Sequence, residues 1–424
     1  MSSLFPGAKI FAPGNNHLAV YQRISRQKQK HDMYNFNEIV NRYGTESVKY
    51  DLYGPEVLPM WVADMDFKTA PEVLEALQKR LDHGVFGYEL VPDDYFEAIG
   101  RWFERRHGWA GIGREHIVPT TGVIPAYSAA IKAMTKPGDK VIVQTPCYNA
   151  FFPAIRNNKC EELHNPLRYE GGKFTVDWDD LEAKAADPRA TAMLLCNPHN
   201  PAGRVWSREE LERIGKICLK NGVFVIADEI HCELTYPGHD YTPYATLPQE
   251  LVKYSVSCIS PTKAFNIAGI QIANIFAHEA EILKKMDRAI NDNECCDVNV
   301  FGVVALKAAY NKGEKWLDEL RAYLWENYKT VQAFLADELP QVTAPPLEGT
   351  YLMWLDCRKV RHADEPEQGF SERLSTHLRN NGLALSTGTI YGPEAEGFER
   401  LNIACPRKTL VEGLRRLKKG IYSY

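Results

Sequence analysis

Short apolar runs bounded by turn-forming residues recur through the middle of the chain. Four of them begin near Lys140, Thr191, Gly222 and Tyr254, as in the stretch Gly222-Val-Phe-Val-Ile-Ala. Continuous apolar runs of this length are typical of strands that are covered on both faces, as in a mainly parallel sheet. We therefore predict four strands here, in a sheet buried between layers of helices.

Helical patterns lie between these runs. The stretch Pro71-Glu-Val-Leu-Glu-Ala-Leu-Gln has helical spacing with proline at its start, and Ser207-Arg-Glu-Glu-Leu opens like a capping box. Alternation of strands and helices is the pattern of a doubly wound α/β domain, which we predict for the centre of the chain.

The pattern changes after about residue 314. A long helix from Lys315 to about Asp337 is followed by short strands and further helices, one of them near Phe370–Asn380, which indicates a smaller α+β domain. A chain of 424 residues is also longer than one typical core supports. We predict four segments: an N-terminal arm (1–34), a segment that packs with the small domain (35–85), a large domain (86–313) and a small C-terminal domain (314–424).

The charge balance narrows the classes of partner. Lys and Arg total 50 against 55 Asp and Glu, a formal net charge of −5, so the chain has no basic excess that would attract nucleic acid or an anionic membrane. Every apolar run is too short to cross a bilayer, and the N-terminus lacks the apolar core of a secretory signal. These features predict a soluble, cytoplasmic protein.

Residues 1–31 stand apart, because they carry five basic residues and no acidic one. This asymmetry fits either a targeting peptide or a docking arm.

The ten cysteines are scattered through strand-like and helix-like stretches, and the closest pair is Cys295–Cys296. A chain of this length builds its own core, so we predict reduced, mostly buried thiols, and neither a disulfide nor a metal site.

Candidate chemistry follows the predicted strands. The stretch Thr120-Thr-Gly122-Val-Ile-Pro125 leads into a helix, whose free backbone amides at Gly122, Val123 and Ile124 would form a cradle for phosphate. An ordinary glycine turn before a helix explains the same residues, so both interpretations stay open on this motif alone.

Two polar turns follow further strands. In Cys196-Asn-Pro-His-Asn200-Pro, the prolines restrict the backbone and would hold the Asn200 amide toward a ligand oxygen. In Ala227-Asp228-Glu-Ile-His231, a carboxylate ends the most apolar strand, where it needs a cationic partner such as a pyridinium nitrogen. A turn without a ligand and a strand-end cap remain the alternatives.

A lysine follows the last of these strands, in Ser260-Pro-Thr-Lys263-Ala-Phe. Flanking hydroxyl and apolar residues are typical of a desolvated amine with a lowered pKa, which can form a Schiff base. A solvent-facing lysine is the alternative.

In this order and spacing, the four motifs resemble the fold-type I enzymes that use pyridoxal 5′-phosphate (PLP). They are most similar to the MalY/PatB-type cystathionine β-lyase (C–S lyase) branch of the class I/II aminotransferase family. The likeness runs from about Asn35 to the C-terminus and includes three further stretches: Pro59-Met-Trp-Val-Ala-Asp-Met-Asp-Phe67, Glu348-Gly-Thr-Tyr-Leu-Met-Trp-Leu-Asp356 and Gly397-Phe-Glu-Arg400-Leu-Asn-Ile-Ala-Cys-Pro-Arg407. The resemblance implies an aspartate-aminotransferase-like fold, with the PLP-binding large domain at 86–313.

The resemblance also implies roles for single residues. Lys263 would hold PLP as a Schiff base and later act as the general base at the substrate Cα. Asp228 would keep the ring nitrogen protonated. The other implied cofactor-binding residues are Gly122, Val123, Ile124, Tyr148, Asn200, His231 and Ser260.

The substrate would be bound by two further segments. Arg400 would hold the α-carboxylate as a bidentate fork, with help from the Ala63 backbone. Tyr88 would reach the phosphate of a neighbouring subunit, so the resemblance implies a homodimer with shared active sites.

The resemblance favours a carbon–sulfur β-lyase that cleaves cystathionine or related S-substituted cysteines to thiol, pyruvate and ammonia. His231 and Gln271 agree with the lyase branch, whereas Glu233 and Tyr391 stand where Asp and Phe are more usual. An aminotransferase and a PLP-binding protein that docks to a regulatory partner are the alternatives.

Overall fold

The structure, a computed structural model, describes residues 33–292 and 297–424. Its contacts divide the chain into Met1–Asn35 and Phe36–Tyr424, and every element named below belongs to the second unit. The predicted basic arm and the pair Cys295–Cys296 lie outside the described residues.

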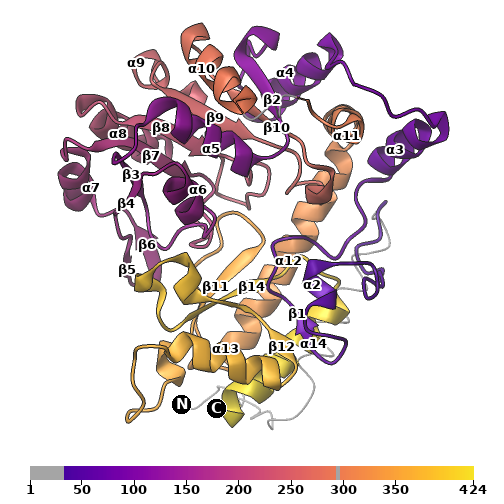
Figure 1. Cartoon of the computed structure of the whole chain (residues 1–424). Coiled ribbons are helices and arrows are strands. Elements are labelled where there is room, and N and C mark those ends of the chain that lie inside the picture. The colour runs from indigo at the N-terminus through magenta and orange to yellow at the C-terminus, as the bar shows by residue number, and fades with distance from the viewer. Residues whose placement is uncertain (1–32, 293–296) are drawn as a thin grey trace, which may run out of the picture. The chain divides into compact units, whose positions relative to one another are not determined.

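A seven-stranded sheet forms the centre of the larger unit (Figure 1). Its order is β2-β10-β9-β8-β7-β3-β4; β10 is antiparallel to both of its neighbours, and the remaining pairs are parallel. The strands are β2 (Ile117–Thr120), β3 (Lys140–Val143), β4 (Glu161–His164), β7 (Ala190–Cys196), β8 (Phe224–Asp228), β9 (Ser255–Ile259) and β10 (Ala273–Phe276).

The four strands predicted from apolar runs are β3, β7, β8 and β9. The pattern missed the three others for physical reasons. The edge strand β4 carries two glutamates and a histidine, β2 contains Pro119, and β10 buries a polar Asn274, so none of them has a continuous apolar run.

Helices cover both faces of this sheet. Alternate residues of β7 point to opposite layers: Leu194 packs in the cluster with α5, α6 and α10, whereas Leu195 packs in the cluster with α7, α8 and α9. The helices are α5 (Val123–Met134), α6 (Phe151–Asn157), α7 (Trp178–Ala185), α8 (Arg208–Lys220), α9 (Gln249–Val252) and α10 (Ala280–Asn291). The predicted capping box is present at the start of α8, where Ser207 and Glu210 bond each other's backbone.

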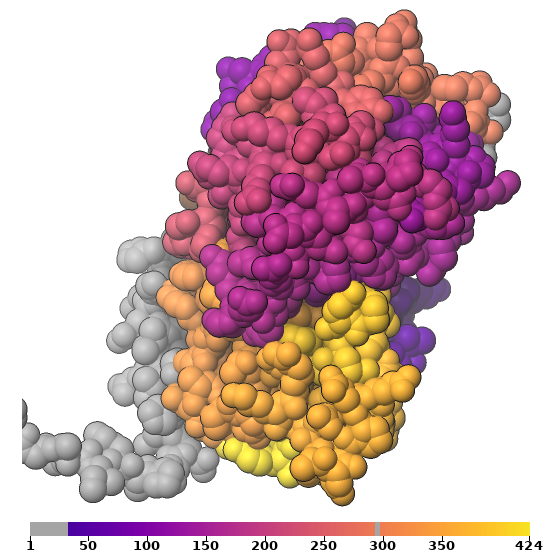
Figure 2. Space-filling view, turned by 90° about the vertical axis from the view of Figure 1, so that its left-hand side faces the viewer, coloured from indigo at the N-terminus to yellow at the C-terminus, as the bar shows by residue number. Residues whose placement is uncertain are grey.

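A second group of elements follows the long helix α12 (Glu314–Glu338), and Figure 2 shows these later residues, in orange and yellow, gathered at one end. An antiparallel sheet of order β11-β14-β13 packs with α13, and α14 packs against α12 and α13. The elements are β11 (Leu352–Asp356), α13 (Phe370–Asn380), β13 (Ser386–Thr387), β14 (Phe398–Asn402) and α14 (Arg407–Ser423).

The segment before the large sheet joins this second group. Strand β1 (Leu58–Pro59) pairs in parallel with β12 (Leu383–Ala384).

The remaining α-helices and strands of the described residues are α2 (Val48–Asp51), α3 (Pro71–His83), α4 (Asp93–His107), β5 (Arg168–Glu170), β6 (Lys173–Thr175) and α11 (Val300–Lys312). The division into domains at residues 86 and 314 stays a prediction.

The eight cysteines within the described ranges are buried free thiols, as predicted for their burial. In the same ranges, every helix is too short or too polar to cross a bilayer.

Candidate active site

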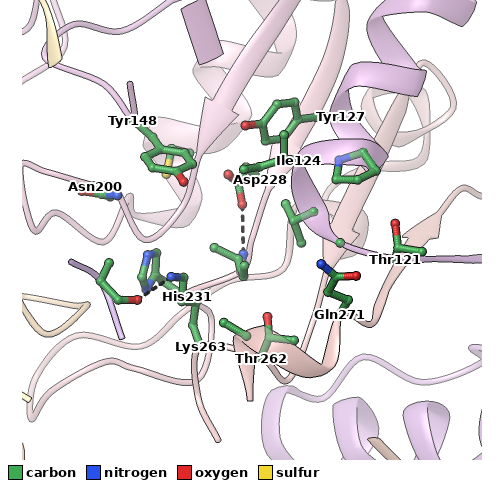
Figure 3. A pocket seen from close by; sticks show the side chains of 17 residues that line it. Thr121, Ile124, Tyr127, Tyr148, Asn200, Asp228, His231, Thr262, Lys263 and Gln271 are labelled. Atoms are coloured by element: carbon green, nitrogen blue, oxygen red, sulfur yellow. Dashed lines mark hydrogen bonds between the residues drawn. The ribbon is translucent and has the colours of Figure 1, made fainter. Parts of the chain in front are cut away.

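A cavity of about 270 Å³ lies at the carboxyl ends of β7 and β8, beside the first turn of α5 (Figure 3). Open α/β sheets bind ligands at this edge, because the loops there are free to carry polar groups. Nine of the predicted site residues line the cavity: Ala63, Gly122, Val123, Ile124, Tyr148, Asn200, Asp228, His231 and Lys263.

Lys263 enters the cavity from the turn that follows β9. Its Nζ donates a hydrogen bond of 2.5 Å to the backbone oxygen of Ala63. Burial lowers the pKa of Lys263 to about 8, and the nearby charge of Arg400 adds to this effect, whereas Asp64 and Asp228 oppose it. At pH 7 a lysine with this pKa is neutral in about one tenth of the molecules, far more often than an ordinary lysine, and the neutral form is the nucleophile.

Asp228 is the last residue of β8, whose five residues are all buried. Its Oδ1 accepts a hydrogen bond of 3.2 Å from the backbone N–H of Ile230 (Figure 3). Burial raises the pKa of Asp228 to about 7, although this bond and the charge of Lys263 favour the ionised form. The carboxylate therefore sits where a cationic ligand group would be strongly favoured.

Two more polar groups close to Asp228 are buried, and neither has a hydrogen-bond partner among the described residues. They are the Tyr127 hydroxyl and Nδ1 of His231. Burial holds the pKa of His231 well below its usual range, so its ring is neutral. Buried polar atoms without partners are costly, and a ligand in this cavity would reduce that cost.

The opposite side of the cavity is formed by the start of α5. Gly122 precedes the helix, and the first backbone amides of the helix, at Val123 and Ile124, line the cavity. Such amides lack partners within the helix and favour an anion. Further polar side chains on the lining are Thr121, Thr262 and Gln271.

Ser260 lies behind this lining. Its hydroxyl donates to the backbone oxygen of Ile272 at 2.7 Å and lies 2.8 Å from the hydroxyl of Thr262. Thr262 itself lines the cavity. A direct phosphate contact for Ser260 stays a prediction.

Arg400 approaches from β14, two hundred residues after the Asn200 turn. Its Nη1 donates to Oδ1 of Asn200 at 3.1 Å, and its Nη2 donates to the backbone oxygen of Trp61 at 2.9 Å. The guanidinium carbon lies 4.9 Å from the ring centre of Tyr391, a cation–π distance. Arg400 is 4% exposed and its Nε has no partner among the described residues, so it has donor capacity left for an anionic ligand.

Like Ser260, Arg400 and Tyr391 are not part of the cavity lining, and two further residues noted in the sequence, Tyr88 and Glu233, also lie outside it. Tyr88 is 99% exposed on the segment before α4. Glu233 is buried and accepts hydrogen bonds from Trp102, Arg106 and His107. Burial favours the neutral acid, but His107, Arg106 and the hydrogen bond from Trp102 outweigh it and lower the pKa of Glu233 to about 2. The departure at position 233 therefore lies in a buried cluster of ion pairs and hydrogen bonds outside the cavity lining.

Sequence reasoning missed Tyr127, Thr121 and Thr262 as lining residues. Tyr127 stands in an apolar helical run, where an aromatic residue is expected in the core. The two threonines directly precede predicted residues, Gly122 and Lys263, and that position was the available signal.

The chain belongs to the aminotransferase class I and II family, whose model matches residues 55–417. It is 42% identical to cystathionine β-lyase PatB of Bacillus subtilis (strain 168), over 91% of this chain and 100% of that protein. It is 32% identical to protein MalY of Escherichia coli (strain K12), over 92% and 99%. The structure matches the PLP-bound C–S lyase of Staphylococcus hominis with a TM-score of 0.84 at 33% identity, over 92% and 99%. The predicted family and fold are thus confirmed.

Proposed function

We propose that this chain is a PLP-dependent carbon–sulfur β-lyase that cleaves cystathionine or related S-substituted cysteines to thiol, pyruvate and ammonia. The observation that carries the proposal is the pairing of a buried amine, Lys263, with a buried carboxylate, Asp228, in one cavity. The similarity to proteins named cystathionine β-lyase and C–S lyase supports this reaction over transamination.

The lining fits PLP group by group. Burial raises the pKa of Asp228, and a protonated ring nitrogen beside it would lower that pKa again, because the two opposite charges would pair away from water. The helix start at Val123 suits a phosphate. Tyr148 and His231 offer rings on the lining, and Asn200 offers a side-chain amide. We therefore assign the cofactor to this cavity.

When bound, PLP supplies an electron sink that stabilises negative charge at the substrate Cα. Lys263 would hold the cofactor and would then remove the proton from the Cα as a neutral amine, which its lowered pKa favours. Asp228 would pair with the ring nitrogen of PLP and keep that nitrogen protonated. Arg400 would bind the substrate α-carboxylate with its planar fork, and the Ala63 backbone would help to orient it. Elimination follows when the β-carbon carries a thiolate leaving group.

We further propose a cytoplasmic homodimer. Eight buried free thiols are typical of a reducing compartment. The stretch Val85, Phe86, Tyr88 and Leu90 exposes four large apolar or aromatic side chains in succession, which a second copy of the chain would cover. Covering this stretch would bring Tyr88 to the phosphate of the partner's site.

Product analysis tests the function. The full chain loaded with PLP is given cystathionine, with and without 2-oxoglutarate, and Lys263→Ala is the control. We expect thiol, pyruvate and ammonia in equal amounts without the oxoacid, and none from the control. Amino transfer that requires the oxoacid would make the chain an aminotransferase. If a well-folded, PLP-loaded protein gives neither set of products, the remaining alternative is a PLP-binding protein that docks to a regulatory partner.

A further inference from the structure

The motif Glu348-Gly-Thr-Tyr351 lies outside the site as described so far, but hydrogen bonds and close packing fix the position of each of its residues. The carboxylate of Glu348 is buried and accepts hydrogen bonds from the Arg204 side chain at 2.8 Å and from the backbone N–H of Val205 at 2.9 Å. Separating the buried charges of Glu348 and Arg204 would be costly, because each would lose a close partner of opposite charge. This pair therefore fixes the turn to the segment that follows Asn200.

The next two positions fix the direction of the chain. A Cβ at Gly349 would lie 2.9 Å from Cβ of Pro198, so only glycine allows this close approach. Thr350 has a φ of +70°, a left-handed conformation that is unfavourable for a β-branched residue. Its backbone is held by Leu234, which accepts from its N–H at 2.7 Å, and by the Tyr236 hydroxyl, which donates to its carbonyl at 2.6 Å. Strained residues that are held in this way cluster at functional sites.

The result of this turn is the placement of Tyr351. Its side chain is 1% exposed, and its hydroxyl donates a hydrogen bond of 2.9 Å to the backbone oxygen of Ala63. The same oxygen accepts the bond from Nζ of Lys263. The backbone on both sides of Ala63 is fixed too, because Nδ2 of Asn402 donates to the carbonyls of Val62 and Asp64, each at 2.6 Å.

We propose that Tyr351 is a positioning residue for Lys263, acting through the backbone oxygen of Ala63 that both side chains share. When the amine of Lys263 is free, its hydrogen bond to Ala63 sets the direction of the nitrogen lone pair, and the Tyr351 hydroxyl holds that acceptor in place. This role rests on the proposed function of Lys263.

The hydroxyl also competes with Lys263 for the shared oxygen. An ammonium at Lys263 is opposed by burial and by Arg400 and is favoured by Asp64 and Asp228, while the neutral ring of His231 adds no charge. A second donor on the Ala63 oxygen reduces its capacity to stabilise that ammonium. Without the hydroxyl, the ammonium gains stability, so the neutral amine forms only at higher pH.

The test compares wild type, Tyr351→Phe and a matched control, Tyr95→Phe. Tyr95 is also buried, and its hydroxyl donates to Oδ1 of Asn274 at 2.8 Å outside the cavity, so the same chemical group is removed at a remote place. The measurements on the full chain are kcat and KM for cystathionine across pH. A second readout is the rate at which added PLP attaches to Lys263 of the cofactor-free protein, with the site mapped by borohydride reduction and peptide mass.

For Tyr351→Phe we expect kcat to fall about tenfold, the effect of one lost hydrogen bond, with KM within about twofold of wild type. We also expect the acidic limb of kcat to move to higher pH and PLP attachment to become slower, while Tyr95→Phe changes neither. A Tyr351→Phe enzyme with wild-type kcat and an unmoved acidic limb overturns the proposal. The proposal is also overturned if Tyr351→Phe and Tyr95→Phe lose kcat and PLP attachment rate to the same extent.

If Tyr351→Phe does not fold, 3-fluorotyrosine introduced at position 351 keeps the shape and makes the hydroxyl a stronger donor. The acidic limb should then move to lower pH, and a limb that stays in place refutes the role. The mapping separates this inference from the function on which it rests. PLP found on another lysine of the wild type removes the proposed role of Lys263. PLP on Lys263 together with unchanged Tyr351→Phe kinetics removes only the role of Tyr351.

Discussion

Replacing Asp228 by asparagine should stabilise the cofactor-free protein above neutral pH while it weakens PLP binding. The asparagine side chain would have nearly the same shape as the aspartate but would carry no charge. In the unfolded chain Asp228 ionises near its ordinary pKa of 3.8, whereas burial raises its pKa to about 7 in the folded chain. Folding therefore favours the protonated acid. The stability that this preference provides is complete below pH 3.8 and is lost as the pH rises through 7.

The size of the effect follows from that rise in pKa. About three pKa units correspond to ~4 kcal/mol of unfolding free energy at pH 8, because each unit is worth about 1.4 kcal/mol. The lost attraction to Lys263 reduces the gain, so we expect Asp228→Asn to be more stable than wild type by roughly 2–4 kcal/mol at pH 8. At pH 4 the two cofactor-free proteins should have almost equal stability.

The assay is urea unfolding of the full chain, followed by circular dichroism at several pH values, with and without PLP. Glu229→Gln is a matched control. Glu229 adjoins Asp228, is also buried with a pKa raised to about 7, and accepts a backbone hydrogen bond from Tyr244, but it does not line the cavity. Without PLP, each variant should lose only part of the pH dependence of the unfolding free energy, because the other buried carboxyl keeps its raised pKa. Added PLP stabilises the fold according to its affinity, so it should stabilise wild type and Glu229→Gln by similar amounts, and Asp228→Asn by less.

Two results would contradict this reasoning. An unfolding free energy of Asp228→Asn that follows wild type between pH 5 and 8 would mean that burial does not raise the carboxyl pKa. Equal stabilisation of all three proteins by PLP would mean that the ring nitrogen does not pair with Asp228.

Three further predictions concern single residues. Lys263→Ala should abolish catalysis and leave PLP bound only reversibly, and a pyridoxyl group on another lysine after borohydride reduction of the wild type would show that the assignment is wrong. Tyr88→Phe should weaken PLP retention about tenfold, as expected for a lost hydrogen bond to a charged group, and a fully active monomer in sedimentation would refute the shared site. Arg400→Ala should raise KM for cystathionine roughly 10- to 100-fold with a smaller fall in kcat, because the carboxylate contact persists through the reaction, and Arg400→Lys should recover only part. An unchanged KM in a well-folded Arg400→Ala protein would remove Arg400 from the site.

Local sequence signals were sufficient for much of the fold. The capping box at Ser207 depends on residues three apart, and the helix at Phe370–Asn380 depends on an apolar repeat within eleven residues, so both were predicted within their true bounds. Asp228 was found because it ends a strongly apolar strand, and Lys263 because it lies in the turn after the next strand. Parallel strands bring their carboxyl ends to one edge of the sheet.

Contacts between segments that are distant in the sequence could not be predicted from such local signals. Tyr127 lies on an apolar helix, and its sequence neighbours do not reveal that its hydroxyl reaches the cavity. The resemblance implied that Ser260 binds the cofactor, and this role stays a prediction; the hydrogen bond from its hydroxyl to the backbone oxygen of Ile272, in the turn before β10, has no local sequence signal. The antiparallel β10 gave no apolar signal, so this contact was invisible in the sequence.

The Ala63 segment shows why the assembly of the site depends on such contacts. Its backbone meets Lys263, two hundred residues away, Tyr351, 288 residues away, and Asn402, more than 330 residues away. Alanine has no side chain that would reveal a role, since the contacts use its backbone oxygen and those of its neighbours. The Arg-x-Asn spacing of β14 then has a physical reason: Arg400 holds the carbonyl of Trp61, and the asparagine two residues later holds the carbonyls on either side of Ala63. One strand therefore sets the positions of both Arg400, which we propose binds the carboxylate, and the acceptor for Lys263, so we expect a shift of β14 against this segment to disturb substrate binding and proton transfer together.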